Sequence, residues 1–321
     1  MKKRKKIVVV GGGTGTFTVL SGLKKYPVNL SVIVSMADDG GSSGLLRDEL
    51  GVLPPGDIRQ CLVALSTSDR LMRELMNYRF VRGKLKGHSV GNLLLSALEK
   101  VTGSFDAAVA KTSEILRIRG QVIPATLDNV RLVAFLKNGG VIRGQHPIDI
   151  RGIANLKRLI LKPSARPNPK ALAALKDADA IVIGPGDLYS SIIPDLLVSD
   201  IARAIAASRA KKIYVCNLMN KARHTDGFTV IDYVREIESY LHGKVDYVIY
   251  NRKRPSALLL RRYGREGERF VEYPKGLPKS QYFGGDLISR AVPHARKGDA
   301  LRRTFIRHNP DRLAKLILKL L

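Results

Sequence analysis

The chain has 321 residues, of which 45% are hydrophobic, and it carries a formal net charge of +27. This composition suffices for a large hydrophobic core and excludes a disordered chain. No apolar stretch is long enough to span a bilayer, and the apolar run after the basic amino terminus is too short for a signal peptide. Cys61 and Cys216 lie in apolar runs, so we expect buried thiols and no disulfide framework. These features predict a cytoplasmic protein.

The positive charge is densest in the last third of the chain, for example at Arg252-Lys253-Arg254 and Arg302-Arg303. A basic surface attracts polyanions. Only 6% of the residues are aromatic, however, and no RNA-recognition signature is present. The charge therefore favours non-specific polyanion association over a dedicated nucleic-acid role.

The first predicted elements form a β-α-β unit. Ile7–Val10 is a continuous apolar run, which is typical of a strand buried on both faces. A glycine loop follows, then a helix from about Thr16 to Lys25 and a second strand at Leu30–Ser35. Apolar residues at helical spacing next predict helices at Asp57–Ser66, Arg70–Tyr78, Val90–Leu98 and Phe105–Leu116.

The middle of the chain changes character. Short strands are predicted at 130–136, 141–144 and 158–161, so we interpret residues of about 121–162 as an antiparallel insertion. After a proline-rich connector, alternation resumes, with strands at Ala180–Ile183, Ile213–Cys216 and Val245–Ile249 and helices at Leu196–Ala207 and Val230–Tyr240. A last helix, Asp311–Leu321, is expected to pack on the body. Residues 1–321 are thus predicted to form a single α/β domain with a mainly parallel sheet and a basic C-terminal segment at about 251–321.

The first candidate site is the glycine loop after the opening strand. Backbone N–H groups in such a loop can approach phosphate oxygens, and the following helix supplies positive potential. The loop is no Walker motif, because the Lys-Ser/Thr pair is missing, and no clean dinucleotide fingerprint, because Thr16 replaces the third glycine. The predicted phosphate-binding residues are Gly12, Gly13, Thr14 and Gly15.

A second loop of this kind follows the second strand. An acidic residue at this position commonly contacts a ribose hydroxyl, whereas two adjacent carboxylates beside phosphates can instead help to hold Mg²⁺. Neighbouring serines and glycines can donate hydrogen bonds to an anion, and Arg47 can offset its charge. The candidate residues are Asp38, Asp39, Gly41, Ser42 and Ser43.

Two further motifs precede predicted helices. In Leu53–Arg59, Asp57 is a natural helix N-cap and Arg59, one turn later, can reach a phosphate. Gly87-His88-Ser89-Val90-Gly91 matches the G-x-S-x-G pattern of serine hydrolases, but a basic turn and not an apolar strand precedes it. We therefore interpret Ser89 as an N-cap, with His88 and Asn92 facing a ligand.

The second half of the chain repeats the design of strand, polar loop and helix. Ligands bind beyond the carboxyl ends of parallel strands, where the strand order switches. Loops after several strands therefore predict one long cleft. These loops add the candidate ligand residues Gly184, Gly186, Leu188, Tyr189, Ser190, Asn217, Thr225 and Asp226.

Taken together, these motifs resemble the gluconeogenesis-factor family of the CofD-like superfamily, which is related to the 2-phospho-L-lactate transferases. The resemblance covers Ile7 to about Tyr240, and the strings Asp38–Gly44 and Pro54–Arg59 are its most specific parts. It implies a Rossmann-like three-layer α/β/α fold. The chain departs from the family pattern at Asp187, at His224 and at Lys221-Ala222-Arg223, where charge is added.

The resemblance leaves several functions open. The leading hypothesis is a regulator that binds a nucleotide sugar, such as a UDP-sugar, without turnover and supports growth on gluconeogenic carbon sources and normal cell shape. The second is a transferase acting on a nucleotide-activated phosphoester, with Mg²⁺ as the possible cofactor at Asp38 and Asp39. The third is a basic scaffold that binds RNA or a partner protein. No catalytic residue is assigned, and a homo-oligomer is expected.

Overall fold

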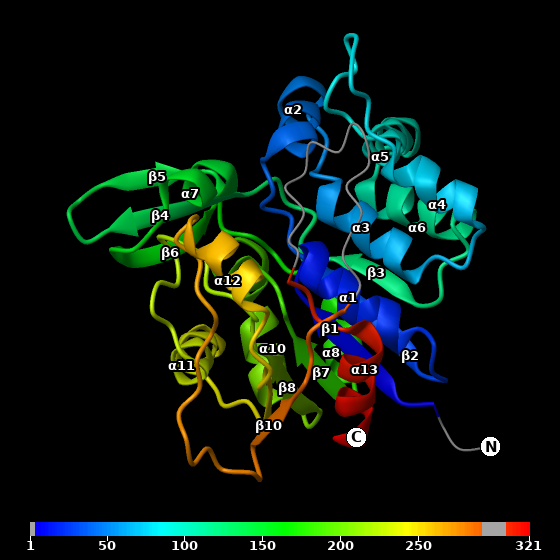
Figure 1. Ribbon diagram of the computed structural model, residues 1–321. Coiled ribbons are helices and arrows are strands. Elements are labelled where there is room, and N and C mark those ends of the chain that lie inside the picture. Colours follow the sequence, from blue (N-terminus) through cyan, green and yellow to red (C-terminus); the bar gives the residue numbers. More distant parts are fainter. Residues whose placement is uncertain (1–3, 291–305) are drawn as a thin grey trace.

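The centre of the molecule is a seven-stranded sheet in the order β10-β9-β8-β7-β1-β2-β3. The computed structural model, which describes residues 4–290 and 306–321, shows this sheet crossing the molecule (Figure 1). Every neighbouring pair of its strands is parallel. The strands are β1 (Lys6–Val10), β2 (Asn29–Val34), β3 (Gln121–Pro124), β7 (Ala180–Ile183), β8 (Lys211–Val215), β9 (Tyr247–Asn251) and β10 (Tyr282–Gly285).

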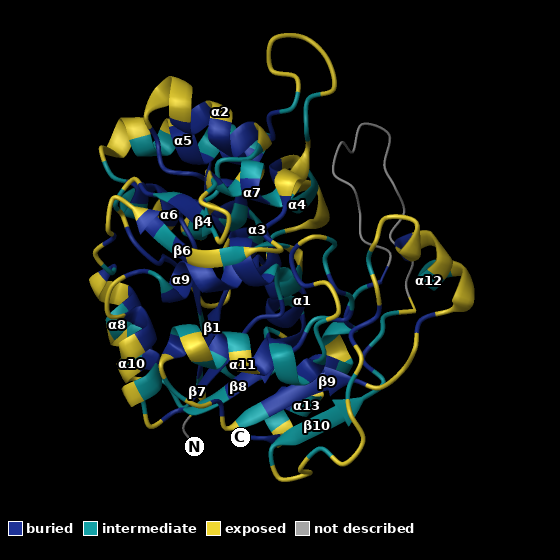
Figure 2. Ribbon diagram, turned by 90° about the vertical axis from the view of Figure 1, so that its left-hand side faces the viewer, coloured by how far each residue is buried: buried dark blue, intermediate teal, exposed yellow. Residues whose placement is uncertain are grey.

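Both faces of the sheet are covered, which accounts for the continuous apolar runs of its strands. In β1, Ile7 and Val9 pack into one core, whereas Val8 and Val10 pack into the other. The first core includes helices α1 (Gly13–Leu23), α3 (Gly56–Leu65), α4 (Arg70–Asn77), α5 (Val90–Thr102), α6 (Phe105–Ile115) and α13 (Pro310–Lys319). The second includes α8 (Pro169–Lys176), a π-helical turn (Leu188–Ile192), α9 (Ile193–Leu196), α10 (Ile201–Ala207) and α11 (Val230–Leu241). The predicted three-layer, mainly parallel fold is confirmed, and the strands are buried between the helices (Figure 2).

The strand order switches beside β1. From there β2 and β3 extend the sheet in one direction, while β7 to β10 extend it in the other. Helix α1, which follows β1, and the π-helical turn, which follows β7, therefore lie on opposite faces of the sheet. This switch in strand order is the place where open α/β sheets bind ligands.

The small lobe, residues 131–162, is the antiparallel part of the molecule. It contains β4 (Arg131–Leu136), β5 (Val141–Arg143), α7 (Gln145–Arg151) and β6 (Leu156–Lys162), and Figure 1 shows it set to one side of the main sheet. The insertion predicted at about 121–162 starts too early, because Gln121–Pro124 pairs in parallel with β2. Periodicity alone could not distinguish this short edge strand from the lobe that follows it.

Two other elements differ from expectation. The helix predicted at Leu196–Ala207 begins later, as α10 at Ile201, because Leu196 ends α9 and Asp200, whose φ is 63°, precedes α10. Residues 41–44, the glycine-serine part of the predicted second loop, instead form the start of helix α2 (Gly41–Leu50). Here tertiary packing overrides a low helix propensity, because the bare Cα of Gly44 lies against the Asp39 carbonyl: a Cβ there would stand 2.1 Å from that oxygen.

The C-terminal segment belongs to the folded body where it is described. It contributes helix α12 (Ala257–Gly264), strand β10 and helix α13. The expected docking of the last helix is confirmed, since Leu313 and Ile317 of α13 are fully buried and Gly22 of α1 lies against the Pro310 carbonyl. Arg302-Arg303 lies outside the described residues. No helix among residues 4–290 and 306–321 is long and apolar enough to cross a membrane.

Candidate functional site

A cleft of about 370 Å³ opens beyond the carboxyl ends of β1, β7 and β8. Three loops and the C-terminal segment form its walls. Six of the predicted site residues line it, namely Gly12, Gly13, Thr14, Gly15, Gly186 and Asn217. The C-terminal segment adds Tyr263, Glu268 and residues 306–308, which the sequence gave no reason to place here.

The glycines of the first loop are needed for close approach. A Cβ on Gly12 would lie 2.1 Å from Oδ2 of Asp57, and one on Gly15 would lie 2.1 Å from the Pro185 carbonyl oxygen. Gly13 has a φ of +68°, which disfavours any other residue, yet a Cβ there would meet nothing nearer than 3.9 Å. The loops after β1 and β7 are therefore in direct contact, and the backbone of Gly13 opens α1 beside the cleft.

Asp57 lies in the first turn of α3 and is not its N-cap, which is Pro55. Its carboxylate instead accepts a hydrogen bond from the backbone N–H of Gly13. Burial and the neighbouring Asp38 raise the pKa of Asp57 to about 7, against the opposing effects of Arg59 and that hydrogen bond. The carboxylate of Asp57 thus already accepts the hydrogen bond of one backbone N–H group that an anionic ligand would use.

Asp38 and Asp39 are adjacent in sequence but have different partners. Asp38 accepts a hydrogen bond from the Gly40 N–H at 2.9 Å, and burial raises its pKa. Asp39 accepts one from the His146 N–H at 2.8 Å, at the start of α7, and pairs with Arg131 at 3.6 Å. Asp39 therefore fixes the small lobe to the main sheet.

Four predicted site residues form a buried polar network, and Ser43 bonds to the backbone near it. Oγ of Ser42 lies 3.0 Å from Nδ1 of His88 and accepts a hydrogen bond from Asn92 at 3.1 Å. The Asn92 side chain in turn accepts from Nε of Arg59 at 2.9 Å. Ser43 accepts from the Gly56 N–H at 3.1 Å. Arg59 is 4% exposed and burial lowers its pKa to about 10, so it stays charged at neutral pH.

The interpretation of Ser89 as a helix cap is confirmed. Its side chain accepts a hydrogen bond from the Asn92 N–H at 3.3 Å at the start of α5, and the residue is fully buried. Nδ1 of the neighbouring His88 is bonded to Ser42 and not to Ser89. This arrangement offers no general base to a nucleophile at Ser89 through that nitrogen.

Several of the remaining predicted site residues form hydrogen bonds with other groups of the protein. Asn217 donates to the Gly186 carbonyl at 2.8 Å, whereas Tyr189 donates to Glu236 at 2.9 Å. Thr225 accepts from Tyr233 at 2.9 Å. The others are Leu188 and Ser190, which are buried, Asp226, which is exposed, Gly41, which begins α2, and Gly184, whose peptide to Pro185 is cis.

Arg47 is buried below the second loop. It is 3% exposed and donates to the Val130 carbonyl at 2.5 Å and to Asn129. Its Nε and Nη1 have no hydrogen-bond partner among the described residues. Arg47 therefore links α2 to the chain that enters the small lobe and retains hydrogen-bonding capacity.

An ionic cluster that sequence reasoning did not assemble lies at the edge of the cleft. Nζ of Lys221 is 2.7 Å from Oδ1 of Asp149 and also pairs with Asp187. Burial alone would raise the pKa of Asp187, but Lys221 and His224 hold it below its ordinary value. The sequence offered one signal for this cluster, namely the departures from the family pattern at Asp187, Lys221 and His224. Nothing in the sequence pointed to Asp149.

Mg²⁺ at Asp38 and Asp39, as the transferase hypothesis requires, does not fit these residues. The two carboxylates are committed to different partners, and neither belongs to a set of three close metal-ligating groups. Among the described residues such a set is formed by Asp149, Asp187 and His224, whose ligand atoms lie within 4.8 Å of one another. The ammonium of Lys221 already contacts both of its carboxylates.

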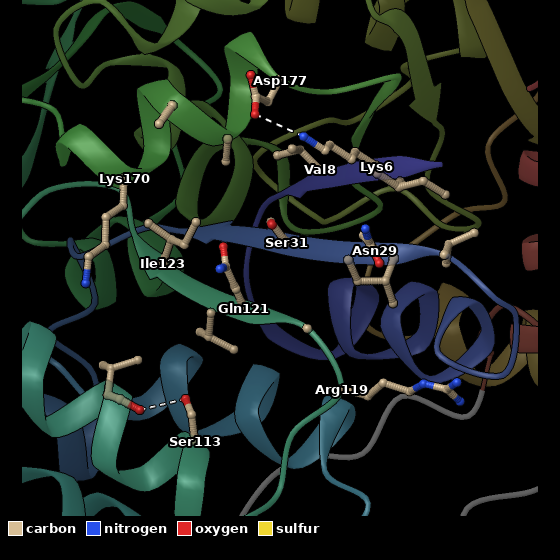
Figure 3. Close-up of a pocket in the computed structure, with 18 of the residues that line it drawn as sticks. Lys6, Val8, Asn29, Ser31, Ser113, Arg119, Gln121, Ile123, Lys170 and Asp177 are labelled. Atoms are coloured by element: carbon tan, nitrogen blue, oxygen red, sulfur yellow. Dashed lines mark hydrogen bonds and ion pairs between the residues drawn. The ribbon is translucent and has the colours of Figure 1, made fainter. Parts of the chain in front are cut away.

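A second hollow, the groove, lies near the opposite end of β1. It measures about 820 Å³ and is lined by the first residues of β1 and β2, by β3 and by one side of α6 and α8. Figure 3 shows it, with Lys6 and Asp177 paired at one rim. No glycine loop leading from a strand into a helix opens onto the groove among its lining residues. Its position beside the starts of the strands makes it the weaker candidate despite its size.

Comparison with known proteins identifies relatives over almost the whole chain. A model of the family described as 2-phospho-L-lactate transferase CofD matches residues 7–282. The gluconeogenesis factor of Bacillus subtilis is 38% identical, over 100% of this chain and 99% of that protein. A protein of Nostoc sp. is 47% identical, over 98% of this chain and 68% of its own length. A crystal structure of a UPF0052-family protein from Bacillus halodurans matches with a TM-score of 0.90 and 37% identity, covering 99% of this chain and 100% of that one.

Proposed function

This chain belongs to the 2-phospho-L-lactate transferase CofD family, among relatives named gluconeogenesis factors, and we propose that it is a regulatory protein that binds a nucleotide sugar, such as a UDP-sugar. The observation that carries this proposal is the cleft itself. It lies at the switch in strand order, and the start of α1 and a glycine loop open onto it. Its volume is within the range of about 300–1,000 Å³ that is usual for small-molecule sites.

The regulatory role is preferred to catalysis for a chemical reason. A transferase that uses Mg²⁺ needs oxygen ligands directed at one point, and Asp38 and Asp39 are bonded to different partners. The polar residues next to the cleft are largely bonded to one another, which favours a site built to hold a ligand. Because the relatives are named gluconeogenesis factors, we also propose a role in carbon metabolism. The family resemblance extends this proposal to cell shape.

The binding proposal is tested by a thermal-shift panel of UDP, UDP-sugars, GDP, NAD and RNA, each with Mg²⁺ and with EDTA. A ligand present at about 100 times its Kd stabilises the folded state by about 2.7 kcal/mol, so we expect a UDP-sugar to raise the Tm by roughly 5 °C. A response to GDP that needs Mg²⁺ would favour the transferase. A response to RNA alone would favour the basic scaffold.

The physiological role is tested by deleting the gene from its host. We expect the deletion strain to grow poorly on gluconeogenic carbon sources and to lose its normal shape, and we expect the wild-type gene to restore both. A Gly13→Val allele that accumulates normally but restores neither property would connect the phenotype to the cleft. Unchanged growth and shape in the deletion strain would contradict this role.

A further inference from the structure

A diphosphate in the cleft needs a cation close to it. Asp187 and Glu268 already place carboxylates there, and like charges repel more strongly as water is excluded. The buried Arg59 is bonded to Asn92 and Asn77, so it cannot approach the ligand without breaking the network. The positive charge beside the phosphates must therefore come from another residue or from a metal ion.

Lys221 is placed to supply this charge. It lines the same cleft as Gly13 and Gly186, and its side chain is about one-third exposed. Nζ of Lys221 contacts Asp149 at 2.7 Å and also pairs with Asp187. Two carboxylates thus face one ammonium, which favours the charged form of the lysine.

The groups around this ammonium include three that can serve as metal ligands. Asp149, Asp187 and His224 offer ligand atoms within 4.8 Å of one another, and carboxylate oxygens with an imidazole nitrogen are common ligands of divalent ions. His224 is 5% exposed, and its Nδ1 has no hydrogen-bond partner among the described residues. Three potential ligand groups from three separate segments thus converge, and the ammonium contacts the two carboxylates among them.

We propose that Lys221 is a built-in cation that takes the place of a divalent metal ion in the phosphate subsite of the cleft. Its ammonium offsets part of the negative charge of Asp149 and Asp187 and contacts the phosphate of the bound nucleotide, so binding needs no metal. The second part of this inference, the contact with the phosphate, rests on the proposed nucleotide-binding function. The first part, that the lysine occupies a cation site, stands on the geometry of the cluster alone.

The small lobe keeps this cluster together. Asp149 belongs to α7, which is held at its start by the hydrogen bond from the His146 N–H to Asp39. Just beyond the end of α7, the Ile153 N–H donates to the Arg223 carbonyl at 2.8 Å. Asp149 is therefore a fixed part of the subsite. Removing only the lysine leaves two carboxylates facing each other without compensation, a situation that strongly favours cation uptake.

The first experiment measures metal binding without nucleotide. Wild type, Lys221→Ala and the double variant Lys221→Ala/Asp187→Asn are titrated with Mn²⁺ by calorimetry, after circular dichroism has confirmed their folds. We expect no binding to wild type, one Mn²⁺ per chain in Lys221→Ala with a raised Tm, and a loss of at least about tenfold in affinity in the double variant. A folded Lys221→Ala protein that ignores Mn²⁺, or a wild type that binds it equally well, overturns the proposal.

The second experiment titrates UDP in EDTA and in Mn²⁺. Wild type should bind equally in both, whereas Lys221→Ala should lose roughly tenfold to 100-fold in EDTA and recover most of it in Mn²⁺. Lys170→Ala is the matched control, because it removes a lysine that pairs with Asp106 at 2.5 Å beside the groove, and it should leave both titrations unchanged. A strict metal requirement in wild type refutes the proposal. If UDP binds no protein, the proposed function fails, and the Mn²⁺ titration still decides whether Lys221 occupies a cation site.

Discussion

The cleft and the groove lie near opposite ends of β1, and the larger of the two is the weaker candidate for a ligand site. The groove measures about 820 Å³ and the cleft about 370 Å³. In the groove, Lys6 pairs with Asp177 at 3.0 Å and Lys170 with Asp106 at 2.5 Å, so these charges are compensated by the protein. In the cleft, the start of α1 and two glycine loops meet, and an acid with a raised pKa lies beside them.

The direction of the strands explains this difference. A parallel strand that enters a helix directs the first N–H groups of that helix beyond its carboxyl end, and the partial positive charge there attracts anions. The groove borders the starts of β1 and β2, away from the carboxyl ends at which these strands lead into helices. The nature of the backbone at a hollow is therefore a better guide to anion binding than its volume.

The largest effect that would separate the two hollows is expected from Gly13→Val. A branched side chain would project where the phosphate must approach, and hydrogen bonds to charged groups contribute about 1.5–3 kcal/mol each, so we expect UDP affinity to fall by about 10-fold to 100-fold. Calorimetric titration measures the loss. The valine also strains a backbone with φ of +68°. Far-UV circular dichroism must therefore show a retained fold, and Gly13→Ala provides a milder version.

A somewhat smaller effect is expected from Asp57→Asn, which should change how the free energy of unfolding depends on pH. The folded state holds the Asp57 proton up to a pKa of about 7, whereas an unfolded aspartate releases it near pH 4. Between these values the folded state binds more protons, so the stability contributed by this group falls as the pH rises through that window. We expect Asp57→Asn to be more stable than wild type at pH 8, by on the order of 2 kcal/mol, and to differ little at pH 4.

Chemical denaturation at both pH values measures this difference. Asp106→Asn in the groove is the control, because a partly exposed ion pair contributes about 0–1 kcal/mol. The carboxylate of Asp57 should repel a phosphate at high pH. Wild-type affinity for UDP should therefore fall between pH 6 and 8 more than that of Asp57→Asn. A variant less stable than wild type at pH 8 would show that Asp57 is charged and well compensated in the folded protein.

The features that the sequence predicted are those whose signals come from residues close to one another in the chain. The strand before Gly11, the glycine loop and the cap at Ser89 were recognised because their signals lie within a few residues of one another. By contrast, the hydrogen bond from His146 to Asp39 joins residues 107 apart, and the pair between Lys221 and Asp149 joins residues 72 apart. No local pattern encodes these contacts, because they arise when the small lobe packs against the carboxyl end of the sheet.

Some predicted site residues line the cleft, whereas others belong to the buried polar network. The sequence could not separate these two groups for a similar reason. The sequence predicts that Arg59 reaches a phosphate and that Asn92 faces a ligand, but it could not show that the two side chains would bond to each other at 2.9 Å. Polar residues in loops are equally common in ligand sites and in the buried networks that support them. The C-terminal contribution to the cleft, which includes Tyr263, had no motif and emerged only from the fold.

The smallest effect, and the one that completes the comparison, is expected from Ala110→Trp. Ala110 is exposed on α6 and lines the groove, so an indole there fills part of the hollow without entering the core. The helix tolerates tryptophan at a cost of roughly 0.5 kcal/mol or less. If nucleotides bind in the cleft, UDP affinity in this variant should stay within about twofold of wild type, a change below roughly 0.4 kcal/mol. The reverse pattern, with tight binding kept in Gly13→Val and lost in Ala110→Trp, would move the ligand to the groove and remove the basis for a phosphate subsite at Lys221.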